Sequence, residues 1–147
     1  MSEAIVNRRA YFDYEILDTY EAGIVLHGFE VKAAKKGMIN LIGAFVVIRG
    51  GEAWLLNATI SPYQAGNIPK DYDPMRSRKL LLKKVEISEL VGFSSKQGLT
   101  LIPLRLYNKR NLVKILIGVG KHKKKSDKRE TIKKRDTERE VRRTLRQ

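Results

Sequence analysis

Few residue types in this chain are suited to catalysis. The 147 residues include no cysteine and two histidines, His27 and His122, which lie far apart in the sequence. Neither a thiolate nor a histidine-based nucleophile system is indicated, and no metal-ligand spacing or phosphate-binding glycine loop occurs. Four acidic residues remain as a candidate carboxylate cluster for a metal-dependent nuclease: Glu21, Glu30, Asp71 and Asp73. Scattered acids of this kind are more often solvated or ion-paired, so the sequence favours a protein that is not an enzyme and uses no cofactor.

The excess of basic side chains is a stronger signal. There are 30 Lys and Arg against 16 Asp and Glu, a formal net charge of +14, and such chains commonly bind a polyanion. The basic residues near one short helix, one loop and the last strand are Lys32, Lys35, Lys36, Arg76, Arg78, Lys79, Lys83, Lys84, Lys114 and Lys121. The aromatic residues interleaved with them are Tyr11, Phe45, Tyr63 and Tyr72. Together they provide the charge and stacking surfaces that looped RNA requires, although any single lysine is more typical of a solvated surface, and Phe45 suits a core equally well.

The C-terminal segment differs in composition from the rest. Residues 121–147 carry 13 basic and 5 acidic side chains, and their only sizeable apolar residues are Ile132, Val141 and Leu145. So few apolar groups cannot offset the entropy of ordering the segment by itself. We therefore expect a basic domain over residues 1–120 and a basic tail over 121–147 that is disordered or conditionally helical. The same scarcity argues against binding to a membrane, and no apolar run approaches the roughly 20 residues of a membrane span.

Most of the domain has the composition of short strands. Strands are expected over residues 11–17, 23–26, 44–49, 52–60, 99–107 and 112–120, with an apolar stub at 79–82, and helices over 29–36 and 84–91. Gly50 and Gly51 predict a tight hairpin turn, Gly23 predicts a bend, and Pro103 predicts an edge strand or a bulge. The long connection over residues 61–78 is expected to be functional or disordered.

These elements predict a mainly β domain of about six antiparallel strands with two or three short helices. Small strand-rich domains often close into barrels, because closure removes exposed strand edges. We expect a closed barrel of the oligonucleotide-binding (OB) type, with a β-sandwich as the alternative. In the first hairpin Ala44, Val46 and Ile48 are expected to face the core, which leaves Phe45 partly exposed on the other face.

Specific strings narrow the possibilities further. Five of them occur in one order: NRRAYFDYEILDTYEAGIVLHGFEVK, NLIGAFVVIRGGEAWLLNATISPY, DPMRSRKLLL, GLTLIPLRLYNKRNLVK and SDKRETIKKRD. Together they closely resemble the small protein B family, the SsrA-binding proteins of bacteria, from Asn7 to about Arg139. No single string is decisive, but the order and separations of all five are very specific.

The resemblance implies a function. Members of this family are not enzymes; they bind the tRNA-like part of transfer-messenger RNA and deliver it to stalled ribosomes in trans-translation. The implied partners are therefore transfer-messenger RNA and the stalled ribosome, where the tail becomes helical in the empty mRNA channel beside the small-subunit decoding centre. A tail with a net charge of +8 would be drawn to RNA by counterion release. We expect a cytoplasmic protein, because no signal-peptide pattern is present, and a monomer when free.

The resemblance also points to individual residues. The RNA-binding positions that it implies, extended by neighbouring lysines, are Asn7, Glu21, Gly23, Glu30, Lys32, Lys79, Leu81, Lys83, Lys114, Lys121, Lys123 and Lys124. The positions implied to face the ribosome are Phe45, Asp127, Lys128 and Arg129. Three of these residues have an alternative: Glu21 as a surface acid paired with a neighbour, Glu30 as a link between helix and barrel, and Leu81 as part of the core.

Several substitutions distinguish this chain from the family's common pattern, and two of them change the chemistry of the side chain markedly. His122 stands where a glycine is frequent, which affects the hinge between domain and tail, and Phe12 stands where a histidine is common, which keeps stacking and loses hydrogen bonding. A general RNA-binding protein that shares the barrel is the second functional hypothesis. Binding without preference for tRNA-like RNA would favour it.

Overall fold

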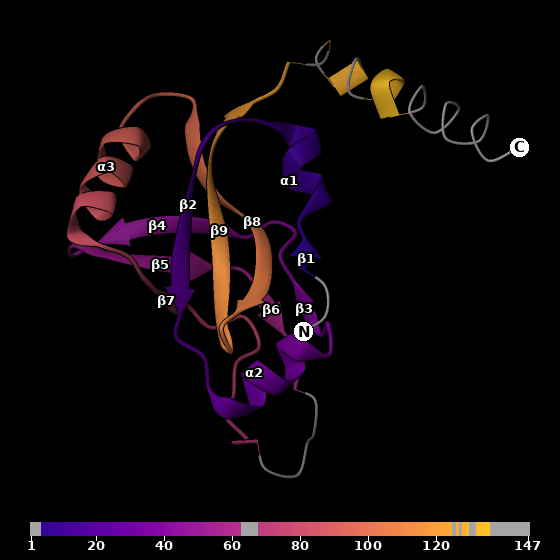
Figure 1. Cartoon of the computed structure of the whole chain (residues 1–147), viewed down its shortest axis with the longest axis vertical. Coiled ribbons are helices and arrows are strands. Elements are labelled where there is room, and N and C mark those ends of the chain that lie inside the picture. The colour runs from indigo at the N-terminus through magenta and orange to yellow at the C-terminus, as the bar shows by residue number, and fades with distance from the viewer. Residues whose placement is uncertain (1–3, 63–67, 125, 127, 130–131, 136–147) are drawn as a thin grey trace, which may run out of the picture.

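The structure, a computed structural model, describes residues 4–62, 68–124, 126, 128–129 and 132–135 (Figure 1). Strands dominate these ranges, and three short helices accompany them. The strands are β1 Ile5–Val6, β2 Tyr14–Ile24, β3 Ile39–Asn40, β4 Phe45–Arg49, β5 Glu52–Leu56, β6 Thr59–Ile60, β7 Arg78–Leu81, β8 Leu99–Lys109 and β9 Leu112–His122. The helices are α1 Arg8–Asp13, α2 Gly28–Lys35 and α3 Lys84–Ser94. The prediction of a mainly β domain is confirmed.

The predicted closed barrel is wrong. Seven strands form one antiparallel sheet in the order β1-β8-β9-β2-β7-β5-β4, and β3 pairs with β6 separately. Strand β4 lies against β8 and runs across the long strands (Figure 1), yet no ladder joins the two edge strands within the described residues. Strand β1, at one edge of the sheet, is only two residues long.

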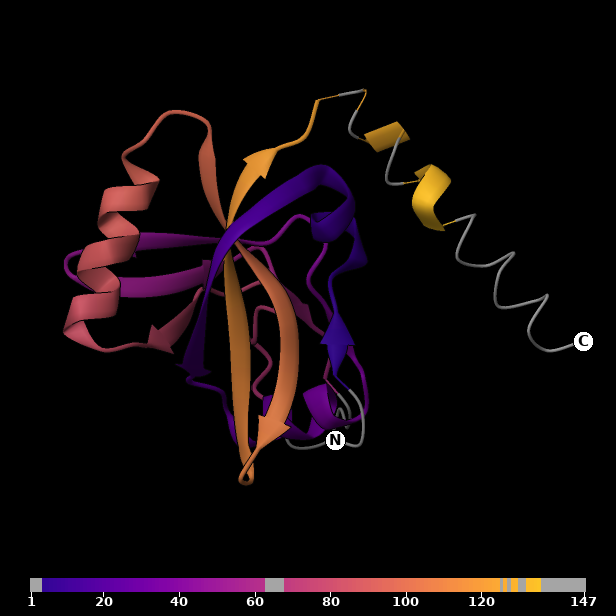
Figure 2. The same ribbon diagram turned by 45° about the horizontal axis from the view of Figure 1, so that its top comes forward.

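Two irregularities curve the long strands. The pairing of β2 with β9 shifts register between Ile16 and Asp18, and the pairing of β8 with β9 shifts between Pro103 and Arg105. Because a bulge inserts an unpaired residue, it bends the strand and increases its twist. Of the two alternatives predicted at Pro103, an edge strand or a bulge, the register shift beside it supports the bulge. Helices α1 and α3 lie on opposite sides of the curved strands (Figure 2).

The hairpin turns follow from their residues. Gly50 and Gly51 have φ of 58° and 75° and join β4 to β5, as predicted. Strands β8 and β9 turn through Arg110 and Asn111, with φ of 52° and 65°. Positive φ at both central residues matches the twist of antiparallel strands, and asparagine tolerates it better than most residues.

The N-terminal part of the domain differs from the prediction. Residues 11–13, expected to be strand, belong to α1, and the Asn7 side chain caps that helix by accepting a hydrogen bond from the Ala10 N–H at 3.3 Å. An N-cap of this kind stabilises a first turn against competing extended structure. Gly23, where a bend was predicted, lies within β2, which continues through it to Ile24.

Buried aliphatic side chains line the interior of the curved sheet. The largest cluster joins the strands to α2 and α3, and its fully buried members include Leu55, Ile60, Leu90, Leu106 and Ile117. The predicted inward face of β4 is confirmed, since Ala44 and Val46 are each 5% exposed and Ile48 is partly buried, whereas Phe45 is half-buried. No helix in the described ranges is long and apolar enough to cross a membrane.

Candidate nucleic-acid interface

An open groove lies on the outer face of the sheet, between β9, β2, β7 and the start of α3. It has a volume of about 490 Å³ and is lined by Glu21, Gly23, Leu81, Leu82, Lys83, Glu86 and Lys114. Five of these residues were predicted to bind RNA, although they come from three separate stretches of the sequence. Strand register explains their meeting, because Gly23 pairs with Leu81 on one side and with Lys114 on the other.

Gly23 forms the floor of the groove. A Cβ added at this position would lie 3.3 Å from Leu81 Cβ, so a larger residue would push against the neighbouring strand. Leu81 is 54% exposed and presents an apolar surface beside this floor. Its partial-core alternative therefore fails, and the side chain is available to contact the apolar face of a base or sugar.

Glu21 is held by two residues of β8 that sequence reasoning did not single out. Its Oε2 accepts a hydrogen bond from the Tyr107 hydroxyl at 2.5 Å, and its Oε1 accepts one from Lys109 Nζ at 3.2 Å. The bond from Tyr107, followed by the bond from Lys109, lowers the pKa of the Glu21 carboxyl. Burial and then the bond to Glu21 raise the pKa of Tyr107 to about 12. Tyr107 is therefore protonated at neutral pH and Glu21 is ionised.

Lys114 has a different environment from Lys109. It is half-buried on β9, between Gly23 and Tyr107 in the register. Across the described part of the chain, none of the hydrogen bonds or ion pairs involves its amine. An ammonium group without a protein partner at a groove is well placed to bind a phosphate oxygen.

Two of the predicted RNA-binding residues are buried. Asn7 is 4% exposed and donates from Nδ2 to the carbonyls of Leu41 and Pro103 at 3.2 and 2.9 Å. Glu30 is fully buried. Because neither side chain reaches the surface, we expect any role of these two residues in RNA binding to be indirect. Asn7 instead fastens the start of α1 to β8.

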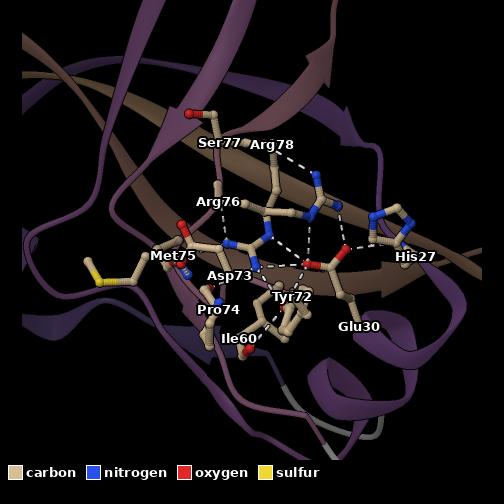
Figure 3. A network of polar contacts seen from close by, with 11 residues as sticks. His27, Glu30, Ile60, Tyr72, Asp73, Pro74, Met75, Arg76, Ser77 and Arg78 are labelled. Carbon is tan, nitrogen blue, oxygen red and sulfur yellow. Dashed lines mark hydrogen bonds and ion pairs between the residues drawn. The ribbon is translucent and has the colours of Figure 1, made fainter. Parts of the chain in front are cut away.

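Glu30 is the centre of a buried ion-pair network (Figure 3). Its Oε2 accepts hydrogen bonds from Arg78 Nη2 at 2.7 Å and from the Tyr72 hydroxyl at 3.0 Å, and its carboxylate also pairs with Arg76. The backbone N–H of His27 donates to Oε1 at 2.8 Å. Since the side chains of both Glu30 and Arg78 are fully buried, this network joins α2 to β7 and to the connection before it.

The network also revises the roles of its other members. Arg78 and Tyr72 were counted among the basic and stacking groups of an RNA surface, but their polar atoms are bonded internally. Tyr63 lies outside the described residues.

The network also sets the charge state of Glu30. Burial alone would raise the pKa of Glu30, but the bonds from Arg76, the His27 N–H and Arg78 outweigh it and lower that pKa to about 2.

The remaining predicted lysines do not lie in the groove. Lys32 is exposed on α2, and Lys79 forms an ion pair with Glu52 at 3.2 Å. Lys121 lies at the opposite end of β9 from Lys114. Lys124 is exposed beyond that end, and Lys123 donates to the Tyr11 carbonyl at 3.1 Å. The structure thus separates these lysines from the five groove residues.

A second cluster lies where the predicted tail begins. Lys128 forms an ion pair with Asp13 at 3.1 Å, and the cations of Arg9, Lys128 and Arg135 lie 5.5, 5.6 and 5.8 Å from the centre of the Phe12 ring. Residues 126, 128–129 and 132–135 are helical. Arg129 is exposed, and Asp127 lies outside the described residues.

Phe45 lies near this second cluster. It lines a hollow of about 240 Å³ together with Arg9, Asp13 and Tyr14. His122, the substitution at the predicted hinge, extends β9 by pairing with Tyr14, and the two rings meet edge to face at 5.1 Å. The strand therefore continues two residues past the predicted domain boundary at 120.

The described residues contain no group of His, Cys, Asp and Glu side chains that could hold a metal ion. Glu21 and Glu30 face different surroundings, since one lies on the sheet surface and the other inside the network of Figure 3. Asp73 accepts a hydrogen bond from the Met75 N–H. The carboxylate cluster considered for a metal-dependent nuclease is therefore not formed among the residues that the structure describes.

The chain is a small, basic β protein. Its curved antiparallel sheet carries short helices, and the outer face of the sheet has a groove lined by lysines. The family model described as "SmpB protein" matches residues 4–147. This chain belongs to that family. The resemblance found in its sequence strings is confirmed.

Curated relatives extend over nearly the whole chain. An SsrA-binding protein of Coprothermobacter proteolyticus is 56% identical over 138 residues, covering 93% of this chain and 92% of the relative. One from Anoxybacillus flavithermus is 50% identical over 141 residues, covering 96% and 91%. A chain of the solved structure "tmRNA-SmpB: a journey to the center of the bacterial ribosome" matches with a TM-score of 0.70 and 43% identity, covering 88% of this chain and 94% of that one.

Proposed function

We propose that this protein is an RNA-binding adaptor for transfer-messenger RNA in trans-translation. It binds the tRNA-like domain of that RNA and delivers it to ribosomes stalled on incomplete messages. The observation that carries the proposal is the convergence of Glu21, Gly23, Leu81, Lys83 and Lys114 in one groove. The names of the relatives and the content of the similar solved structure support it.

The groove offers three kinds of contact. The amines of Lys83 and Lys114 pair with backbone phosphates, which positions an RNA without reading its sequence. Glu21 accepts hydrogen bonds from a 2′-hydroxyl or a base amino group. Leu81 packs against an apolar face. All three are binding contacts of the kind that an RNA adaptor requires.

The proposal extends to the whole chain. Residues 1–120 form the RNA-binding domain, and residues 121–147 form a basic tail that follows the empty mRNA channel from the decoding centre. Phe45, Lys128 and Arg129 face the ribosome there, with Asp127 between the domain and the rest of the tail. The helical state of residues 132–135 is compatible with this role. The protein works in the cytoplasm and is monomeric when free.

Removing one groove charge is expected to change the salt dependence of RNA binding. In Lys114→Gln, loss of one phosphate contact should weaken binding and reduce the slope of log affinity against log salt by about 0.7 to 0.9. In Glu21→Gln, affinity should fall by about 10-fold, because a neutral amide oxygen is a weaker hydrogen-bond acceptor than an ionised carboxylate. Filter binding or fluorescence anisotropy over a salt series measures both quantities.

A matched control is Lys96→Gln. Lys96 follows the far end of α3 from the groove, so its removal should leave the affinity for the tRNA-like domain nearly unchanged. Equal losses in Lys96→Gln and Lys114→Gln would assign binding to overall charge and contradict a role for the groove.

A further inference from the structure

The Glu21 carboxylate is held by two side chains of β8, Tyr107 and Lys109, which reach it across β9. Glu21 on β2 is paired with Leu116 of β9, and Tyr107 of β8 is paired with Lys114 of β9. The hydrogen bond from Tyr107 to Glu21 therefore passes diagonally over β9. Lys109, two residues further along β8, reaches the same carboxylate and lies 3.2 Å from Oε1 and 3.4 Å from Oε2.

These hydrogen bonds leave the Glu21 carboxylate able to bind a ligand. Each carboxylate oxygen has two acceptor sites. Oε2 accepts from both Tyr107 and Lys109, whereas Oε1 accepts only from Lys109. One acceptor site therefore remains on Oε1 for a hydroxyl or amino group of a ligand. Because Glu21 is 37% exposed, this site is within reach of the groove.

The bonds from Tyr107 and Lys109 also affect whether the Lys114 amine is available to a ligand. This lysine lies between Gly23 and Tyr107 in the register and contributes to the field at Glu21 without bonding to it. With Lys109 as the ion-pair partner of Glu21, the carboxylate does not draw the Lys114 amine away from the groove. A carboxylate lacking Tyr107 and Lys109 would instead pair with Lys114, whose charge already acts on it.

We propose that Tyr107 and Lys109 are positioning residues for RNA binding: they orient the Glu21 carboxylate toward the ligand and keep the Lys114 amine free to bind phosphate. This inference rests on the proposed function and names the residues that prepare its groove. Neither residue needs to contact RNA. Because they act through Glu21, their effect can be distinguished by experiment from the loss of a direct contact with RNA.

The test is a double-mutant cycle in the full chain. Tyr107→Phe removes the hydroxyl and keeps the ring, and it is expected to weaken binding of the tRNA-like RNA by about 10-fold. Glu21→Gln should give a similar loss, and the double variant should bind no more weakly than Glu21→Gln alone, since residues acting as a unit are not additive. Losses that multiply in the double variant would overturn the inference, because Tyr107 would then act independently of Glu21.

Tyr20→Phe is the matched control. The Tyr20 hydroxyl donates to Glu89 at 2.7 Å, so this variant deletes the same kind of tyrosine–glutamate bond outside the groove. It should bind RNA like the parent. A loss equal to that of Tyr107→Phe would overturn the inference, because any such bond would then have the same effect through general stability.

A titration without RNA separates this inference from the proposed function. Because the Tyr107 bond lowers the pKa of Glu21, Tyr107→Phe should raise that pKa, observed by NMR of the side-chain carboxyl carbon. The acid limb of RNA binding should move to higher pH in the same direction. An unchanged Glu21 titration would overturn the positioning role, whereas a parent protein that titrates as expected but ignores transfer-messenger RNA would overturn only the proposed function.

Discussion

Replacing Glu30 with glutamine is expected to lower the free energy of unfolding by about 3–5 kcal/mol, because it leaves a buried guanidinium without its counter-charge. Arg78 is fully buried, and its Nε and Nη2 both donate to Glu30, at 2.9 and 2.7 Å. Glutamine keeps the volume but cannot neutralise this charge. Urea denaturation of the full chain, followed by the fluorescence of Trp54, measures the change.

Glu52→Gln provides the matched control. It also removes one carboxylate from an ion pair, but the side chains of Glu52 and Lys79 are 46% and 42% exposed. Exposed pairs contribute about 0–1 kcal/mol, so this variant should unfold almost like the parent. Equal losses of stability in the two glutamine variants would contradict a structural role for the buried network.

The pH dependence of unfolding gives a second measurement of the same network. The pKa of Glu30 is lowered to about 2 in the folded protein, so the ionised group favours folding above its unfolded pKa, which lies near 4.3. This contribution should be lost as the pH falls from about 4.3 toward 2, where Glu30 becomes protonated in the folded state as well. In Glu30→Gln the corresponding part of the pH dependence should disappear.

Truncation after Lys124 is expected to abolish peptide tagging on stalled ribosomes while leaving binding of transfer-messenger RNA nearly intact. The cut preserves β9 to His122 and the hydrogen bond from the Lys123 N–H to the Asp13 carbonyl at 2.8 Å. It removes the densely basic segment that RNA would attract. A reconstituted translation reaction on a message without a stop codon measures tagging.

A full-length variant with the order of residues 125–147 scrambled controls for charge. It keeps the composition of the tail, so RNA attraction is unchanged, but it loses the arrangement of its residues along a helix. We expect it to bind transfer-messenger RNA and to tag poorly. Normal tagging by the truncated protein would show that the tail is not needed on the ribosome.

Local signals predicted the hairpins and two helices well. Paired glycines at 50 and 51 and the run before Gly37 specify their own backbone geometry, so short-range chemistry was sufficient. Helix α1 was missed because residues 11–13 have strand-like composition, and its cap at Asn7 depends on contacts to distant Leu41 and Pro103. Barrel closure was wrongly expected because pairing at the sheet edges depends on strand length and curvature.

The groove residues came from family resemblance rather than from periodicity. Pattern alone placed Lys83 and Lys114 among many surface lysines, and only the register of β7, β2 and β9 shows which of them converge. The bond between Tyr107 and Glu21 spans 86 positions, and no local signal predicts it. Burial of Glu30 was also not apparent, since its neutralising partners Arg76 and Arg78 lie just before and at the start of β7, where the sequence has no periodic pattern.

A competition experiment decides whether this protein recognises transfer-messenger RNA or merely binds RNA. The full chain is titrated into labelled transfer-messenger RNA with an excess of bulk tRNA, at an ionic strength of about 0.15 M, since low salt lets a strongly basic protein hold almost any RNA. We expect complex formation to survive the competitor and to be lost in Glu21→Gln. Equal displacement by bulk tRNA would contradict the adaptor function and leave a general RNA-binding protein in its place.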